Sequence, residues 1–371
     1  MEGTRVLDFT TLLPGPLATL MLAEAGARVI KIERPGRGDE MRSYEPKFGT
    51  DSVNFALLNR GKESLEVDLK SREAGELLRR LVEDADVLVE QFRPGVMQRL
   101  GLGYDAVAEI NPRLVYCSIS GYGKEGPRAG VAAHDLNYVS ETGLLGLTAG
   151  SDGAPVLPQA LIADIGGGAY PAVINILLAL LERERTGEGA YLDVSMSENV
   201  FTFLYWAIGN GTAVGEWPEA GNDLVTGGSP RYNIYRTADG RYVAAAPLEE
   251  KFWRNFCDIL GLEEPLRDDS RDPEATKAAV AERIASLSAD HWRERFEGED
   301  VCCTVVRGIR EALEDEHFKA RGVFDRSVED GDGRGIPALP LPVVSGFRRP
   351  ELRLGYPVLG EANASVEEEA G

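Results

Sequence analysis

Short apolar runs alternate with amphipathic segments along the first half of the chain. Four runs that are short, apolar and rich in β-branched or aromatic side chains predict strands, at residues 6–9, 28–32, 87–90 and 114–118. Segments with helical spacing lie between or after them, at residues 17–26, 72–84 and 104–110. Strands that alternate with helices form right-handed crossovers, so this order predicts an α/β fold with a doubly wound, Rossmann-like parallel sheet.

The second half of the chain has a different pattern. Two alternating runs within residues 232–246 flank Ala238-Asp239-Gly240, which indicates a hairpin. Helices are then expected near residues 249–260, 274–287 and 308–321. We therefore predict three parts: a large α/β domain over 1–222, a smaller α+β domain over 223–330, and a C-terminal segment, 331–371, that returns to the large domain. Residues 366–371 are acidic and are expected to fray.

Several features bear on the compartment of the protein. The longest apolar stretch, residues 169–181, is shorter than the roughly 20 residues that span a bilayer, so we expect a buried helix and no membrane partner. The N-terminus has no basic segment leading into an apolar run, so no signal peptide is expected. Four cysteines lack metal-binding spacing and predict a reducing compartment, the cytoplasm.

Acidic residues exceed basic ones by 61 to 40, which gives a net charge of −21. Nucleic acids and anionic membranes require a basic face, so the charge argues against both as partners. Only eight of the 40 basic residues are lysines. Two interpretations stay open: ordinary solubility, and a halophilic protein adapted to high internal salt.

Histidine is scarce, with His134, His291 and His317 as its three positions. His291 and His317 lie in charged helical segments and are expected at the surface. His134 follows the Gly/Pro-rich loop 121–130 and precedes an apolar helix. Its position alone leaves a catalytic histidine and a helix-capping or core histidine equally open.

Asp164 precedes Ile-Gly-Gly-Gly at the start of the most apolar helix. Glycines there would let a ligand approach the backbone, and free N–H groups at a helix start stabilise a developing anion. The alternative is an N-cap aspartate, for which this position is equally typical. No GxGxxG follows the first strand, and no cluster has metal-ligand spacing, so neither a dinucleotide nor a metal is expected.

The stretches AAHDLNYVSETGLLG and LIADIGGGAYPAVINILLALLERERTGEGAYLDVSM resemble the corresponding segments of α-methylacyl-CoA racemases, within the family III CoA-transferase superfamily. Further segments agree in order: LLPGPLATLMLAEAGARVIKIERPGRGD, VDLKS, QFRPGVMQRLGLGY and ADGRYVAAAPLEEKFW. The resemblance covers residues 3–330. It favours functional roles for His134 and Asp164.

The resemblance implies an isomerase of fatty acid metabolism that epimerises 2-methylacyl-CoA thioesters through an enolate. His134, partnered by Glu249, would serve one face of the α-carbon and Asp164 the other. No separate cofactor would be needed, because CoA is part of the substrate.

The first alternative is a family III CoA-transferase, in which Asp164 is the nucleophile that carries acyl and CoA-thioester intermediates. Such transferases generally lack the matching histidine, and they carry a longer glycine-rich loop where this chain has only residues 226–230. The second alternative is a non-catalytic CoA-binding protein. It would have lost at least one of the three site residues, and all three are present.

The resemblance also implies how CoA is held and how the chain assembles. It places the nucleotide and pantetheine against Arg34, Val67, Asp68, Leu69, Lys70, Gln91, Phe92, Arg93, Arg99, Ala133, Asp135, Leu136, Asn137 and Tyr138. Arginine suits phosphate because its planar fork donates two hydrogen bonds at once. Asp39 is expected to cap a turn. The assembly implied is an intertwined homodimer, in which the small domain of one chain helps form the active site of the other.

Overall fold

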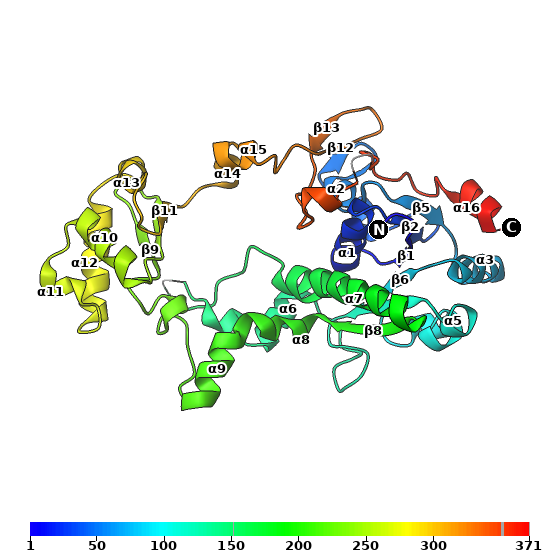
Figure 1. Cartoon of the computed structure of the whole chain (residues 1–371), viewed down its shortest axis with the longest axis horizontal. Coiled ribbons are helices and arrows are strands. Elements are labelled where there is room, and N and C mark those ends of the chain that lie inside the picture. Colours follow the sequence, from blue (N-terminus) through cyan, green and yellow to red (C-terminus); the bar gives the residue numbers. More distant parts are fainter. Residues whose placement is uncertain (151, 350–351, 371) are drawn as a thin grey trace. The chain divides into compact units, whose positions relative to one another are not determined.

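A computed structural model describes residues 1–150, 152–349 and 352–370. Its central sheet has six parallel strands in the order β5-β2-β1-β6-β7-β8 (Figure 1). The strands are β1 Arg5–Phe9, β2 Arg28–Glu33, β5 Glu63–Glu66, β6 Val87–Glu90, β7 Val115–Ser120 and β8 Ala190–Ser195. The strand order reverses between β1 and β6, as in the dinucleotide-binding folds. The predicted α/β class with a doubly wound parallel sheet is confirmed, although β5 and β8 were not predicted.

Helices cover both faces of this sheet. On one face, α3 (Arg72–Glu83), α5 (Tyr104–Ile110) and α16 (Asn363–Ala370) share a core with alternate strand residues such as Leu7 and Ile30. The first crossover helix, α1 (Pro14–Glu24), and α7 (Tyr170–Thr186) contact each other and the strands on the opposite face. Two buried faces explain why the strands are almost continuously apolar.

The chain divides into two compact units. Unit 1 comprises residues 1–142, 159–202 and 316–371, and unit 2 comprises residues 143–158 and 203–315. The predicted boundaries at 222 and 330 therefore differ from the observed ones. Residues 203–222 belong with the smaller unit, and residues 316–330 belong with the larger.

Unit 2 is built on an antiparallel sheet of β9 (Asn233–Arg236), β10 (Tyr242–Ala245) and β11 (Cys303–Val305). The predicted hairpin is the β9–β10 pair. Its core is formed by aromatic residues, Trp253, Phe256 and Trp292, from helices that pack on the sheet. The helices of unit 2 are α9 Tyr205–Val214, α10 Glu250–Leu260, α11 Glu264–Arg267, α12 Pro273–Ala285, α13 Ala289–Phe296 and α14 Ile309–Leu313.

The remaining elements of unit 1 are short. They are β3 Lys47–Phe48, β4 Asp51–Ser52, α2 Val53–Asn59, α4 Val96–Arg99, α6 Asp135–Glu141, a π-helix Ala163–Ala169, α8 Met196–Val200, α15 Glu316–Ala320, β12 Ser327–Glu329 and β13 Gly335–Pro337. Single 3₁₀ turns lie at Glu40–Ser43, Leu145–Leu147, Phe201–Leu204, Leu224–Thr226 and Ser345–Phe347, the second and fourth of them in unit 2. Phe201–Leu204 spans the boundary between the units.

The C-terminal segment is part of the unit 1 core. The Ala362 N–H donates to the Ser64 carbonyl at 3.0 Å, and the Glu66 N–H donates to Asn363 Oδ1 at 2.8 Å. Val366 in α16 is fully buried beside α3 and β5. The expectation that residues 366–371 fray is wrong for residues 366–370, which are helical; Gly371 lies outside the described residues.

The apolar helix α7 is only partly buried. It continues the π-helix, so residues 163–186 form one helical stretch. Among the described residues, this is the one helix long and apolar enough to cross a membrane by length and composition, which is weak evidence for a membrane span. Its outer face exposes Ile174, Leu177 and Leu178, and Leu181 is 71% exposed. The expectation of a buried helix is therefore wrong for this face.

Candidate active site

A pocket of about 380 Å³ opens in unit 1 at the carboxyl edge of the parallel sheet. Most of its lining residues lie at or after the ends of four strands. They are Leu12 and Pro14 after β1, residues 91–94 after β6, residues 119–121, 129 and 131–134 in and after β7, and Met196 after β8. The strand order reverses between β1 and β6, and ligands of open α/β sheets bind in the crevice at such a reversal. Asp164, Asn137 and Tyr138 complete the lining.

His134 lies on the pocket at the start of α6. Its backbone is extended (φ −129°, ψ 176°), and its N–H donates to Asn137 Oδ1 at 3.0 Å. The side chain of Asn137 therefore caps the backbone of this turn. The His134 imidazole is exposed on the pocket lining rather than buried in the core.

Asp164 lies in the first turn of the π-helix, which begins at Ala163 with Ile162 at the cap position. It is therefore not the N-cap aspartate of the alternative interpretation. The Ala163 and Asp164 N–H groups both donate to Asp135 Oδ1, at 2.7 and 2.9 Å. The buried Asp135 carboxylate thus fixes the Asp164 backbone, and the Asp164 N–H predicted to stabilise an enolate already has a partner.

The electrostatics of the pocket favour a protonatable Asp164. Burial and, to a lesser extent, the nearby Asp135 carboxylate raise the pKa of Asp164 to about 6, against the opposing effect of His134. A carboxyl group with a pKa near 6 is mostly ionised at pH 7, yet it accepts a proton more readily than an ordinary aspartate. The pocket therefore contains an acid–base group poised near neutral pH, beside a histidine.

Two glycines after Asp164 serve close helix packing. A Cβ on Gly167 would lie 2.3 Å from the Met196 carbonyl oxygen, and one on Gly168 would lie 3.1 Å from Pro14 Cβ. The π-helix can therefore rest directly on the start of α8 and on the loop after β1. At Gly167 and Gly168 the space that a side chain would fill is occupied by other parts of the protein, so these two glycines do not make room for a ligand as expected.

The predicted CoA-binding residues fall into two groups. Six line the pocket: Gln91, Phe92, Arg93, Ala133, Asn137 and Tyr138. The others lie outside its lining, and of these Arg34, Asp68, Lys70, Arg99 and Leu136 are exposed. Arg34 and residues 67–70 follow β2 and β5, so they share the carboxyl edge of the sheet with the pocket. Val67 is buried, Leu69 is half-buried, and the Asp135 side chain points inward to the Asp164 backbone.

Ten residues of the pocket lining were not predicted from the sequence: Leu12, Pro14, Pro94, Ile119, Ser120, Gly121, Ala129, Val131, Ala132 and Met196. The signal for Leu12 and Pro14 was present, because both follow a predicted strand at the edge where ligands bind. Met196 follows β8, which was not predicted.

Glu249 belongs to unit 2, where it is exposed at the residue before α10. The Cys302 thiol lies near Glu249: burial raises the pKa of this thiol, and the Glu249 carboxylate adds to the effect. The pairing of Glu249 with His134 stays a prediction.

The parallel sheet and its pocket are those of an α/β enzyme, and residues 1–363 match the profile of CoA-transferase family III. The chain belongs to this family, which confirms the resemblance drawn from its motifs. It is 35% identical over 377 residues to human alpha-methylacyl-CoA racemase, covering 100% of this chain and 93% of that protein. It is also 35% identical over 378 residues to acetyl-CoA:oxalate CoA-transferase of Acetobacter aceti, covering 99% and 95%. The crystal structure of a CAIB/BAIF family protein from Brucella suis matches it with a TM-score of 0.85 at 29% identity, covering 100% and 99%.

Proposed function

We propose that this enzyme is an α-methylacyl-CoA racemase that epimerises 2-methylacyl-CoA thioesters. The observation that carries the proposal is the presence of His134 and Asp164 on one pocket, each supplied by a different helix start. Inversion at a carbon needs a base on one side and a protonated group on the other, and these two side chains have the right chemistry for both roles.

The proton balance is closed within the pocket. The ionised Asp164 removes the α-proton, the C–H electron pair moves into the thioester to form an enolate, and protonated His134 returns a proton to the opposite face. In the reverse direction neutral His134 is the base and protonated Asp164 the acid. Asp164, with its pKa raised to about 6, can serve in both forms near neutral pH. Glu249 would orient the imidazole and stabilise its charged form.

The CoA portion is proposed to bind along the carboxyl edge of the sheet. Arg93 on the pocket and Arg34 and Arg99 beyond it are exposed, so they are available to phosphate groups. The reaction would need no further cofactor, because CoA travels with the substrate. The described residues contain no group of three or more His, Cys, Asp or Glu that could hold a metal.

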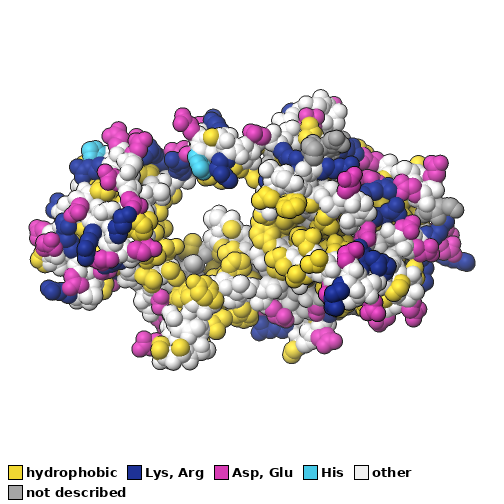
Figure 2. Space-filling view, viewed as in Figure 1, with side chains coloured by type: hydrophobic (Ala, Val, Ile, Leu, Met, Phe, Trp, Pro, Cys, Tyr) yellow, Lys and Arg dark blue, Asp and Glu magenta, His cyan; other side chains and the backbone are white. Residues whose placement is uncertain are grey.

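A homodimer is proposed as the working assembly. An apolar groove of about 720 Å³ in unit 1 is lined by α1, α7 and residues 342–347. Figure 2 shows hydrophobic side chains gathered over α1 and α7. Exposed apolar faces of this extent are typical of surfaces that bind another protein, which supports a second copy as the partner. All four cysteines are free thiols, as expected for the cytoplasmic, fatty acid-metabolising enzyme proposed here.

A CoA-transferase is the second candidate. It is favoured by the equal identity to the A. aceti transferase and by Asp164, whose half-buried carboxylate lines the pocket and could attack a thioester carbonyl. Attack would form an acyl anhydride with Asp164 and release the CoA thiolate. The thiolate would then attack the Asp164 carbonyl, which breaks the anhydride, gives an enzyme–CoA thioester and releases the donor acid as a carboxylate.

The deciding experiment is incubation of the enzyme with a 2-methylacyl-CoA in D₂O. A racemase gives α-deuterium and loss of configuration. His134→Ala and Asp164→Ala should each abolish inversion while leaving α-exchange on opposite faces, and His291→Ala is the matched control for loss of a histidine. CoA transfer to free acids without α-exchange, with hydroxylamine trapping of Asp164, would reject the racemase and support the transferase.

A further inference from the structure

Leu12 has a backbone conformation that is unusual for its type. Its φ of 62° lies in the left-handed region, and it is one of two non-glycine residues with positive φ in the described ranges. A side chain with a Cβ is strained there, so such a residue persists only where its surroundings fix it. Leu12 and Pro14 also form an apolar part of the pocket that contains Asp164.

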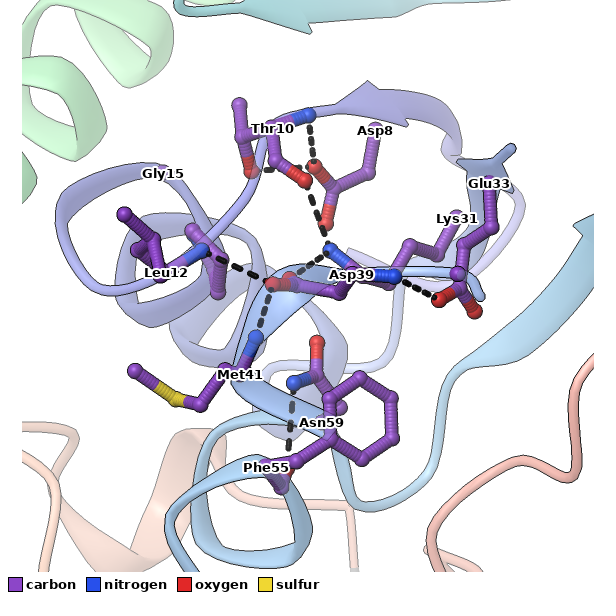
Figure 3. A network of polar contacts seen from close by, with 12 residues as sticks. Asp8, Thr10, Leu12, Gly15, Lys31, Glu33, Asp39, Met41, Phe55 and Asn59 are labelled. Atoms are coloured by element: carbon purple, nitrogen blue, oxygen red, sulfur yellow. Dashed lines mark hydrogen bonds and ion pairs between the residues drawn. The ribbon is translucent and has the colours of Figure 1, made fainter. Parts of the chain in front are cut away.

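Buried charges hold the loop on both sides of Leu12. The Leu12 N–H donates to Asp39 Oδ1 at 3.2 Å, and the Lys31 ammonium donates to the Thr10 carbonyl at 2.7 Å (Figure 3). In the first turn of α1, the Lys62 ammonium donates to the Pro16 carbonyl at 2.9 Å. Residues 10–16, which comprise the loop after β1 and the start of α1, are therefore held by buried ionic groups.

Asp39 is the member of this network that contacts the strained residue. Its carboxylate is fully buried and lies 3.0 Å from the Lys31 ammonium through Oδ2, while Oδ1 also accepts the Met41 N–H. It therefore caps the turn at residues 40–43, as expected from the sequence, and binds the loop after β1 at the same time. One carboxylate links the Lys31 charge to the backbone of a pocket residue.

We propose that Asp39 is a positioning residue, which fixes Leu12 in the left-handed conformation and so sets the apolar wall that faces the acyl group. This inference rests on the proposed function, in that the pocket takes an acyl-CoA. Release of the Leu12 N–H would let φ return to the common region, which would rotate the Leu12 peptide and move its side chain. Pro14 packs closely on Gly168, one helical turn from Asp164, so the displacement would change the space beside the reacting carbon.

The test variant is Asp39→Asn. Asp39 uses one oxygen for the Leu12 and Met41 N–H groups and the other for Lys31. A carboxamide has a single acceptor oxygen, so its NH₂ group must face either Lys31 or the Leu12 N–H, and one contact becomes repulsive. The matched control is Asp51→Asn, which removes a charge from the Arg42 side of the same network without a recorded contact to residues 10–16.

Two measurements read out the effect. The first is amide hydrogen exchange of residues 10–16 other than Pro14 and Pro16, which have no amide hydrogen. The second is the ratio of Kd values for two unreactive CoA thioethers, S-ethyl-CoA and S-(2-methyloctyl)-CoA. Neither probe has a thioester carbonyl, so binding does not depend on whether the enzyme is a racemase or a transferase. Asp39→Asn should speed exchange of the Leu12 amide at least about tenfold and change the Kd ratio by about tenfold, and Asp51→Asn should change neither.

Leu12→Gly supplies an independent check. Glycine adopts positive φ without strain, so Asp39→Asn should have little further effect on the Kd ratio in a Leu12→Gly background. Equal behaviour of Asp39→Asn and Asp51→Asn in both measurements would overturn the proposal. If neither thioether bound the unmodified enzyme, the CoA-binding function would fail, and the selectivity role would fail with it. The exchange comparison would then decide only whether Asp39 holds the loop.

Discussion

Two carboxylates of unit 1 have pKa values that are shifted in opposite directions: Asp8, fully buried in the ion network, and Asp164, half-buried in the pocket. Burial raises the pKa of both. At Asp8 this effect is outweighed by the Lys62 and Lys31 ammonium groups and by hydrogen bonds from Thr10 and Thr19, so its pKa lies well below the usual range. At Asp164 a second carboxylate adds to burial, and only His134 opposes it. Burial alone therefore does not decide the charge of a carboxylate; the number of nearby cations does.

The balance between burial and nearby opposite charges also explains why the two lysines of the network have different pKa values. Lys31 and Lys62 are both fully buried. Burial lowers the pKa of each. Lys31 faces Asp39, Asp8 and Glu33, and its pKa is raised. The pKa of Lys62 falls to about 8, because burial and the Lys31 charge outweigh the Asp8 carboxylate. Buried charges that are balanced by counter-ions stabilise the fold. A group whose charge is only partly balanced, and whose pKa lies near neutral pH, is suited to proton transfer.

Removal of a compensating charge should have the largest effect. Lys62 donates to Asp8, Thr19, Asn59 and Pro16. Lys62→Met should lower the free energy of unfolding by about 3–5 kcal/mol, because it leaves the buried Asp8 charge with one fewer partner. Denaturant unfolding at pH 7 measures the loss, with the exposed Lys70→Met as control. A loss equal to that of the control would show that the network is not the compensated cluster described.

Removal of the Asp164 charge, which is not balanced by nearby cations, should change the free energy of unfolding in the opposite direction. The raised pKa of Asp164 means that the folded state binds more protons than the unfolded state between about pH 4 and pH 6, so this group makes stability fall as pH rises through that window. Asp164→Asn should therefore raise the free energy of unfolding by on the order of 2 kcal/mol at pH 7, and the gain should vanish near pH 4. Unfolding curves of both proteins from pH 4 to pH 8 check this. A gain independent of pH would contradict it.

The exposed arginines proposed to bind CoA phosphate groups should affect substrate binding and not turnover. Arg93→Ala and Arg99→Ala should each raise KM for an acyl-CoA about tenfold with little change in kcat, because phosphate contacts remote from the α-carbon bind ground and transition states alike. Arg72→Ala, an exposed arginine on α3, is the control. An unchanged KM for Arg93→Ala or Arg99→Ala would assign that arginine to structure alone.

Salt concentration should have the smallest effect on stability. It should act through the charges at the surface and not through the buried ion network. The Debye length falls from about 10 Å at 0.1 M to about 3 Å at 1 M, so repulsion within a chain of net charge −21 is screened by KCl. We expect the Tm to rise by about 3 °C or more between these concentrations. The loss of unfolding free energy in Lys62→Met should be the same at both KCl concentrations, since buried ion pairs are screened little. A flat or falling Tm would remove the halophilic interpretation.

The fold was largely predictable, because four of the six strands are apolar runs of ordinary length. The strands β5 and β8 were not predicted because polar residues interrupt their apolar pattern: Glu63, Ser64 and Glu66 in β5, and Asp193 and Ser195 in β8. The buried charge of Lys31 was also unpredictable from local pattern. Its partner Asp8 lies opposite it on the neighbouring strand, and that register exists only in the assembled sheet.

The candidate site was predicted in part. His134 and Asp164 were found through their motifs, and the structure brings both to one pocket. The buried role of Asp135 was not predictable, because its partners Ala163 and Asp164 are 28 and 29 residues away along the chain. The same holds for Leu12, whose positive φ depends on Asp39 rather than on a glycine or asparagine signature.

The docking of α16 against β5 and α3 has a consequence for how the protein is made. The edge strand β5 is complete by residue 66, but its Glu66 N–H and the apolar surface beside it find their partners only in Asn363 and Val366. During synthesis the ribosome must add about 300 further residues, on the order of 15–60 s of elongation, before that edge is covered. Through that interval the nascent sheet presents an open edge to chaperones, and a stop codon that removes only the last helix would leave it open permanently.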